Sequence, residues 1–189
     1  MSSSGRENEI KLAAPDVATA QNWLRDAGFV VSKPRVFESN TLFDTAEGRL
    51  RQQQQLLRLR SAGFDFVITY KGPPDPGPHK SREEWETKFE DHRAMAAIFD
   101  RLGYVPVFIY EKYRTEFQKL GEEDGLATLD ETPIGVFVEL EGTPEWVDRT
   151  AAQMGFAQTE YILASYGKLY SQWAQSRGIE RRHMVFSQS

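Results

Sequence analysis

Five pairs of like charges two positions apart stand in stretches where apolar and polar residues alternate, a spacing that puts both residues of each pair on one face of a β-strand. The pairs are Glu7 and Glu9, Arg58 and Arg60, Glu84 and Glu86, Lys112 and Arg114, and Glu139 and Glu141. Such pairs repel each other on an open surface. The repulsion becomes useful where a ligand or ion supplies the opposite charge.

These pairs offer two kinds of chemistry. Arg and Lys bind polyanions, and an Arg guanidinium can donate two parallel hydrogen bonds to one phosphate group. Carboxylates bind hard divalent cations, which prefer oxygen ligands. If the strands close into a barrel with the charged faces inward, the lumen has a basic half and an acidic half, which suits a metal–triphosphate complex. Taken singly, each strand is better explained as a half-buried strand with a solvated polar face, and only the set of pairs together favours the inward arrangement.

Strands must position most of these residues. Alternating apolar and polar residues predict extended segments near 6–12, 35–44, 56–61, 64–71, 82–90, 106–118, 126–130 and 134–141. A turn at 61–63 is expected to join the third and fourth segments into a hairpin. The run at 72–78, GPPDPGP, excludes helix and inner strand and predicts a loop.

Helices are predicted between and after the strands. Asp16, Asp91 and Thr143 are typical N-caps, and the three helices that they begin are expected to stop at the glycines at 28, 103 and 155. A further helix is predicted over 166–176. Helices interspersed among antiparallel strands indicate an α+β fold.

Composition excludes several classes of protein. The 189 residues are 40% hydrophobic, which is enough for the core of one domain. The absence of Cys excludes disulfides, thiolate zinc sites, iron–sulfur clusters and cysteine nucleophiles. The net charge of −5 is not gathered into a basic stripe, so we expect no nucleic-acid partner. No apolar leader or membrane-length segment is present, and we expect a cytoplasmic protein with no membrane association.

Taken in order, the motifs resemble those of the CYTH domain, also called the triphosphate tunnel metalloenzyme superfamily. The matching segments are ENEIK at 7–11, LFDT at 42–45, LRLR at 57–60, TYK at 69–71, REEWE at 82–86, KYR at 112–114, LD at 129–130, GVFVELE at 135–141 and SY at 165–166. The resemblance implies a closed eight-stranded antiparallel β-barrel that forms a tunnel, with helices packed outside. It covers nearly the whole chain, so we expect a single domain over 1–180. Residues 181–189 are expected to form a polar tail, and the sequence does not predict whether that tail is ordered.

The resemblance also implies roles for the charged residues. The cations expected to bind the triphosphate are Lys11, Arg58, Arg60, Lys71, Arg82, Lys112 and Arg114. Lys168, in the last helix, is a further candidate, although it could equally be an exposed lysine. The carboxylates expected to bind Mg²⁺ or Mn²⁺ are Glu7, Glu9, Asp130, Glu139 and Glu141, with Glu84 and Glu86 nearby. Candidates for the catalytic group that orients the attacking water are Glu7, Glu9 and Glu139.

Three functions follow from this reading. The leading prediction is a divalent-metal-dependent triphosphatase acting on inorganic, thiamine or nucleoside triphosphate. A class IV adenylyl cyclase, which makes cyclic AMP and pyrophosphate from ATP, would also need an adenine pocket, and nothing in the sequence marks one. A non-catalytic polyphosphate- or nucleotide-binding module needs the basic half more than the acidic half, so two intact Glu-x-Glu strands favour catalysis. Monomer and homodimer both remain open.

Overall fold

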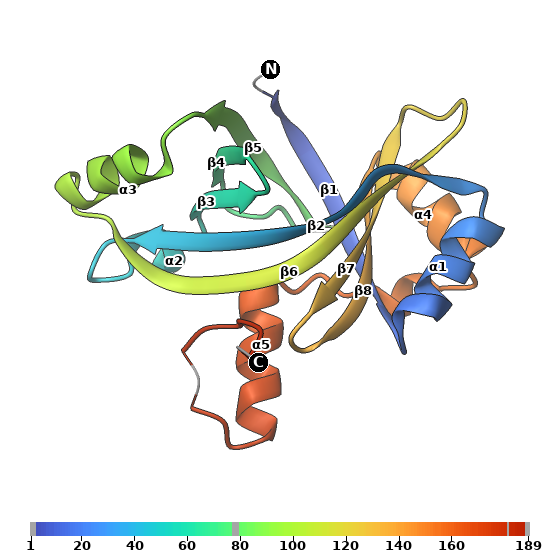
Figure 1. Ribbon diagram of the computed structural model, residues 1–189. Coiled ribbons are helices and arrows are strands. Elements are labelled where there is room, and N and C mark those ends of the chain that lie inside the picture. The colour runs from blue at the N-terminus through green and yellow to red at the C-terminus, as the bar shows by residue number, and fades with distance from the viewer. Residues whose placement is uncertain (1–2, 77–79, 181, 188–189) are drawn as a thin grey trace.

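Eight antiparallel strands close into one barrel (Figure 1). The computed structural model describes the backbone of residues 3–76, 80–180 and 182–187, and the side chains of the same ranges without 3–7 and 80. The strands are β1 (Ser3–Ala14), β2 (Phe29–Asp44), β3 (Leu56–Ala62), β4 (Asp65–Lys71), β5 (Lys80–Phe89), β6 (Val105–Lys119), β7 (Gly125–Thr132) and β8 (Gly135–Gly142). Their order around the barrel is β1-β5-β4-β3-β2-β6-β7-β8, which confirms the predicted fold class.

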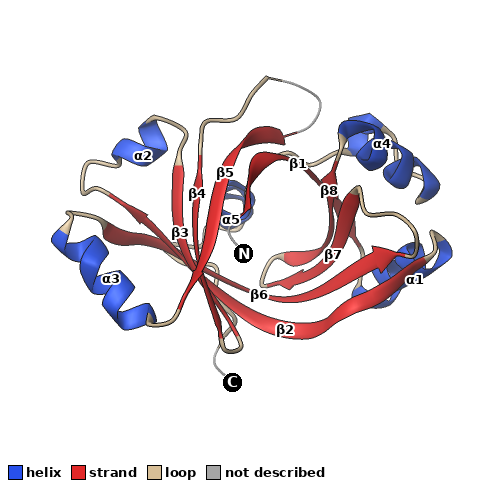
Figure 2. Ribbon diagram, turned by 90° about the horizontal axis from the view of Figure 1, so that it is seen from above, coloured by secondary structure: helices blue, strands red, loops and turns tan. Residues whose placement is uncertain are grey.

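The helices pack on the outer, apolar faces of the strands. They are α1 (Val17–Asp26), α2 (Arg49–Gln52), α3 (His92–Arg101), α4 (Pro144–Gln153) and α5 (Tyr166–Ser176), with a 3₁₀ turn at Gln158–Glu160. Seen from above, α1 and α4 lie on one side of the barrel and α2 and α3 on the other (Figure 2). The largest core cluster joins α1 and α4 to the barrel through Ile10, Leu12 and Trp146, which are all buried. No helix among the described residues is long and apolar enough to cross a membrane.

Strand β2 begins at Phe29, six residues before the segment predicted to start at 35. Pro34 lies within the added part, and proline cannot donate to a sheet ladder. The structure accommodates it between two shifts in the β2–β6 register, one between Val31 and Lys33 and the other between Lys33 and Val36. Such irregularities are places where a strand tolerates proline. The longer β2 brings Lys33 to the barrel mouth.

Asp44 turns the chain at the end of β2. Its side chain accepts hydrogen bonds from the backbone N–H groups of Thr45, Leu50 and Arg51, at 2.8, 2.8 and 3.0 Å. This local cap holds the short helix α2, which the sequence pattern did not predict. A four-residue helix is too short to show a hydrophobic period.

The chain after α5 returns to the barrel. Met184 is fully buried and forms a parallel bridge with Tyr110 of β6. The backbone N–H of Ile109 donates to His183 Nδ1 at 3.1 Å, and the Met184 carbonyl accepts from the N–H of Glu111 at 2.9 Å. Described residues of the predicted tail therefore cover part of the edge of β6 that precedes its pairing with β7.

Candidate active site

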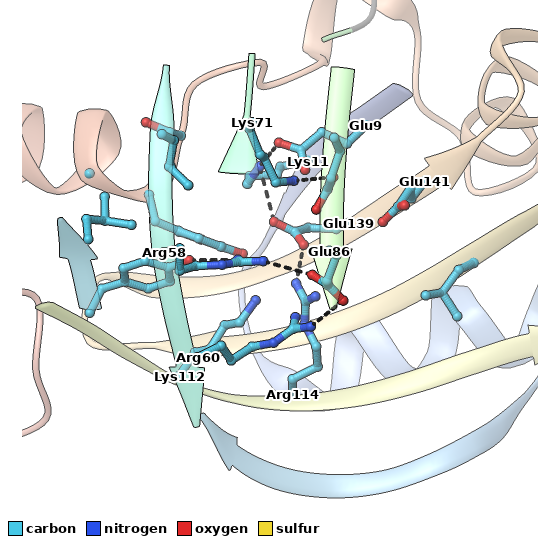
Figure 3. A pocket seen from close by; sticks show the side chains of 18 of the residues that line it. Glu9, Lys11, Arg58, Arg60, Lys71, Glu86, Lys112, Arg114, Glu139 and Glu141 are labelled. Carbon is cyan, nitrogen blue, oxygen red and sulfur yellow. Dashed lines mark hydrogen bonds and ion pairs between the residues drawn. The ribbon is translucent and has the colours of Figure 1, made fainter. Parts of the chain in front are cut away.

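The inward faces of the strands enclose a cavity of about 430 Å³ (Figure 3). Most of its lining is charged. The cations are Lys11, Lys33, Arg58, Arg60, Lys71, Arg82, Lys112 and Arg114. The carboxylates are Glu9, Glu84, Glu86, Glu116, Glu139 and Glu141. Tyr110 and Tyr166 add two aromatic rings. Because side chains alternate between the two faces of a strand, the polar face of each strand lines the lumen and its apolar face packs against the helices.

Strands β1 and β8 bring two carboxylates and a lysine together. Glu139 lies opposite Lys11 in the register, and Glu141 lies opposite Glu9. Lys11 Nζ is 3.1 Å from Glu9 Oε1 and 3.1 Å from Glu139 Oε1. Burial alone would lower the pKa of Lys11, but Glu139 and Glu9 raise it above its ordinary value. Lys11 is therefore a fixed cation between two carboxylates.

A second cluster is built around Asp130, which is fully buried. Its oxygens accept hydrogen bonds from Lys112 Nζ at 2.8 Å, from Arg114 Nε at 2.7 Å and Nη2 at 2.6 Å, and from the Tyr166 hydroxyl at 2.7 Å. Arg114 also pairs with Glu139. Burial and then Asp130 raise the pKa of Tyr166, so its hydroxyl keeps the proton that it donates. Asp130 thus lies behind the cations that face the cavity.

A third cluster holds the arginines of β3. Arg60 Nη2 lies 3.1 Å from Glu86 Oε1, and Arg58 Nη2 lies 3.5 Å from Glu86 Oε2. Arg58 also donates to Thr69 Oγ1 at 3.0 Å and to the Tyr110 hydroxyl at 3.2 Å. On the same strands, Lys71 Nζ lies 2.8 Å from Glu84 Oε2. The Arg58–Arg60 pair of β3 is therefore compensated by Glu86 of β5, with β4 lying between the two strands.

Sequence reasoning missed two residues on the inner face of β2. Glu38 Oε2 lies 3.6 Å from Lys112 Nζ. Burial alone would raise the pKa of Glu38, but Lys112, Arg114, Arg60 and Arg58 lower it to about 2. Asn40 is fully buried, and both polar atoms of its side chain lack a hydrogen-bond partner among the described residues. The alternation of Glu38, Asn40 and Leu42 could have placed them on one face of the strand, but neither Glu38 nor Asn40 belongs to a like-charged pair.

The predicted residues fall into three groups. All predicted phosphate-binding cations except Lys168 line the cavity; Lys168 is exposed on α5 and is not part of the lining. Of the predicted carboxylates, Glu9, Glu84, Glu86, Glu139 and Glu141 line it. Asp130 lies behind the lining, and the side chain of Glu7 lies outside the described residues. Lys33 and Glu116, which form an ion pair of 2.8 Å at the mouth, were not predicted.

The donor set suits a hard divalent cation with few protein ligands. Glu9 and Glu141 lie on paired strands and offer carboxylate oxygens at one side of the cavity. No three carboxylate or imidazole groups among the described side chains are arranged as a ligand cluster. Mg²⁺ in phosphate-processing sites is commonly held by one or two carboxylates and completed by substrate phosphates and water. The residues present fit that mode.

Comparison with known proteins agrees with this geometry. The model of the CYTH domain family matches residues 5–164. A Methanocaldococcus jannaschii protein named "Putative adenylate cyclase" is 35% identical over 136 residues, which cover 71% of this chain and 75% of that protein. A solved Pyrococcus horikoshii structure has a TM-score of 0.74 at 24% identity, covering 88% of this chain and 98% of that one. A Hippeastrum protein, for which a dominant triphosphatase activity is described, has a TM-score of 0.62 at 21% identity, covering 93% and 97%.

Proposed function

The chain belongs to the CYTH domain family, and on that basis we propose that it is a divalent-metal-dependent enzyme that hydrolyses a small triphosphate inside its barrel. One observation carries the proposal. A single cavity holds the Arg58–Arg60 pair and the Glu9–Glu141 carboxylates, with Lys11 between Glu9 and Glu139. A polyanion and a divalent cation are the two species that such a lining can bind together.

The cations are the groups proposed to bind and orient the triphosphate. Arg58 and Arg60 come from one strand and share a face, so their guanidinium groups can contact adjacent phosphate oxygens. Lys112 and Arg114 face them from β6 and are held by Asp130. Positioning and electrostatic stabilisation supply most of the catalysis in phosphoryl transfer, since little covalent chemistry is required of the protein.

Glu9 and Glu141 are the residues proposed to hold Mg²⁺ or Mn²⁺. When bound, such an ion supplies positive charge that neutralises phosphate oxygens. Glu9 and Glu139 are also proposed to orient the attacking water, with Glu7 as a third candidate. Burial alone would raise the pKa of Glu139, but Lys11, Arg114 and Lys112 lower it far below its ordinary value. A carboxylate held this acidic is a weak base, so its role here is to orient the water rather than deprotonate it.

Adenylyl cyclase activity is the second candidate. The name of the Methanocaldococcus jannaschii relative favours it. Cyclisation directs the ribose 3′-hydroxyl at the α-phosphorus of ATP and needs a pocket for adenine and ribose in addition to the phosphate site. The apolar lining of the cavity consists mainly of Leu42, Leu56 and Leu126 besides the two tyrosine rings. We place hydrolysis first because it needs only the groups already described.

A product assay tests the proposal. The protein is incubated with Mg²⁺ or Mn²⁺ and either inorganic triphosphate, thiamine triphosphate or ATP, and phosphate, pyrophosphate and cyclic AMP are measured separately. We expect phosphate release that depends on the metal. Cyclic AMP with an equal amount of pyrophosphate would instead establish the cyclase. Tight triphosphate binding without any product would establish a binding module.

A further inference from the structure

Two carboxylates of β5 lie among the cations of the cavity. Glu86 is shared between Arg60, at 3.1 Å, and Arg58, at 3.5 Å, and it accepts a hydrogen bond of 2.9 Å from Thr69 Oγ1. Glu84 pairs with Lys71 at 2.8 Å. Figure 3 shows the Arg58 guanidinium directed at Glu86, with Glu141 well to the side. The side chain of Glu86 therefore occupies the place between two arginines where an anion would bind.

The sheet register builds this arrangement. Arg58 lies opposite Thr69 across β3 and β4, and Thr69 lies opposite Glu86 across β4 and β5. The three residues thus form one row on the inner face of three adjacent strands. Directly opposite side chains in antiparallel strands are close enough to interact. Thr69 completes the row, because it accepts from Arg58 and donates to Glu86.

We infer that Glu86 is an internal counter-anion of the Arg58–Arg60 pair, one that a phosphate compound must displace in order to bind. Glu84 has the same relation to Lys71. The inference rests on the proposed function for the place where the triphosphate binds. It assigns these carboxylates to the phosphate half of the cavity, whereas the sequence analysis expected them near the metal.

A counter-anion of this kind sets a threshold for binding. A phosphate group between Arg58 and Arg60 brings a second negative charge close to Glu86, and like charges in a partly buried site are unfavourable. Inorganic phosphate makes few other contacts with which to offset that cost. A triphosphate can contact several further cations of the lining at once. Glu86 therefore favours the binding of long polyanions over the binding of single anions such as inorganic phosphate. The specificity comes from disfavouring the wrong ligand rather than from an added contact to the right one.

Calorimetric titration without divalent metal tests the inference, since loss of a carboxylate that acts only as a metal ligand would change metal-free binding little. Wild type and Glu86→Gln are each titrated with inorganic triphosphate and with inorganic phosphate in the presence of a chelator. We expect Glu86→Gln to lower the triphosphate Kd by about tenfold, which corresponds to about 1.4 kcal/mol. We also expect the Kd of inorganic phosphate to fall by a larger factor than that of triphosphate, so that the variant discriminates less between the two ligands.

Two controls separate this effect from a general change of charge. Glu83→Gln removes a carboxylate from the exposed outer face of the same strand, where Glu83 accepts a hydrogen bond from Trp85, and its Kd should match wild type. Glu141→Gln removes a carboxylate from the cavity away from the arginines and should strengthen binding less than Glu86→Gln does. Equal strengthening by Glu86→Gln and Glu141→Gln would overturn the inference.

Loss of the ion pairs could also weaken the fold, so melting temperatures are measured with and without triphosphate. Glu86→Gln should melt lower than wild type when free but gain more from triphosphate. Glu84→Gln, which removes the carboxylate that pairs with Lys71, should show the same pattern. If wild type binds triphosphate and neither variant binds it more tightly, this inference fails while the proposed function stands. If no protein binds triphosphate, both fail.

Discussion

Lys11 couples the two halves of the cavity through its contacts. Its ammonium group lies equally close to Glu9 and Glu139, and it stands 5.2 Å from the centre of the Tyr166 ring. Glu139 in turn pairs with Arg114, which Asp130 holds. Buried charges are tolerated when each is paired and hydrogen-bonded, and costly when one partner is removed. Single substitutions here therefore change the charge of a network, and neighbouring variants should not be additive.

Glu38 gives a prediction for acid stability. Its pKa is lowered from 4.5 to about 2 in the folded protein, so the folded state binds this proton more weakly than the unfolded state. The resulting stabilisation is present above pH 4.5 and is lost as the pH falls toward 2. We expect Glu38→Gln to lower the free energy of unfolding at pH 7 by about 1 to 3 kcal/mol. The difference from wild type should shrink steadily between pH 5 and pH 3 in urea titrations.

The control for this prediction is Glu47→Gln, which changes an exposed carboxylate outside the cavity. It should follow the wild-type curve throughout. A Glu38→Gln deficit that stays constant between pH 5 and pH 3 would contradict the proposed role of Lys112 and the arginines in holding Glu38 ionised.

For individual residues, the sequence predicted which side chains face the cavity better than it predicted which cation pairs with which carboxylate. A period of two places Arg58 and Arg60 on one face of their strand, and Glu84 and Glu86 on one face of theirs, and the family resemblance turned those faces inward. Which carboxylate meets which cation depends on strand register, and register is set by neighbours that are distant in sequence. For this reason Glu86 was expected near the metal, and the pairing of Asp130 with Lys112, Arg114 and Tyr166 was not foreseen.

Among the elements, the strands were the easiest to predict and the irregular segments the hardest. Alternation identified each strand of the barrel, and the caps at Asp16, Asp91 and Thr143 identified the starts of α1, α3 and α4. The part of β2 that was not predicted, residues 29–34, depends on register shifts beside Pro34. Helix α2 depends on the hydrogen bonds that the Asp44 side chain accepts. The docking of Met184 depends on a free edge of β6. None of these features has a periodic signal in the sequence.

Gly125 gives a prediction for packing between elements. A Cβ atom added at this position, the first residue of β7, would lie 2.3 Å from the ring of Trp146 in α4. Both partners are fixed, because Trp146 is buried and its Nε1 donates to Glu122 at 2.9 Å. We expect Gly125→Ala to destabilise the protein by roughly 1–3 kcal/mol. Thermal unfolding should show a melting temperature lower by about 2–4 °C per kcal/mol.

Gly167→Ala is the matched control. It lies in α5, and its added Cβ would meet Phe108 at 3.6 Å, an ordinary contact. Because Ala is the better helix former, this variant should melt at or above the wild-type temperature. If both variants melt alike, Trp146 is not packed against β7 as described.

At the scale of the whole molecule, closure of the barrel lets one cavity collect charges from strands that are far apart in sequence. Alternation alone left open whether the polar faces met inside or pointed to solvent. The family resemblance, and not the periodicity, predicted closure, and the structure confirms it. Closure also means that a ligand in the lumen contacts several strands at once, so binding should stabilise the entire barrel.

Ligand binding should therefore raise the melting temperature. A polyanion that binds only the folded state at about a hundred times its Kd adds about 2.7 kcal/mol to the free energy of unfolding. For a protein of this size that corresponds to roughly 5–10 °C. Inorganic triphosphate with Mg²⁺ is compared with potassium chloride at matched ionic strength. An unchanged melting temperature with saturating triphosphate would argue strongly against a polyanion site in the barrel.

The division of the cavity into a metal half and a phosphate half is tested most directly by comparing Glu9→Gln with Arg60→Ala. Triphosphate turnover is measured against Mn²⁺ concentration, and triphosphate Kd is measured for both variants. Glu9→Gln removes a proposed metal ligand, so turnover should collapse and recover in part at high Mn²⁺, while triphosphate binding largely survives. Arg60→Ala removes a phosphate contact worth roughly 1.5–3 kcal/mol, so affinity should fall about ten- to a hundredfold and metal should not restore it. Two fully active variants, or two variants with the same defect, would contradict this division.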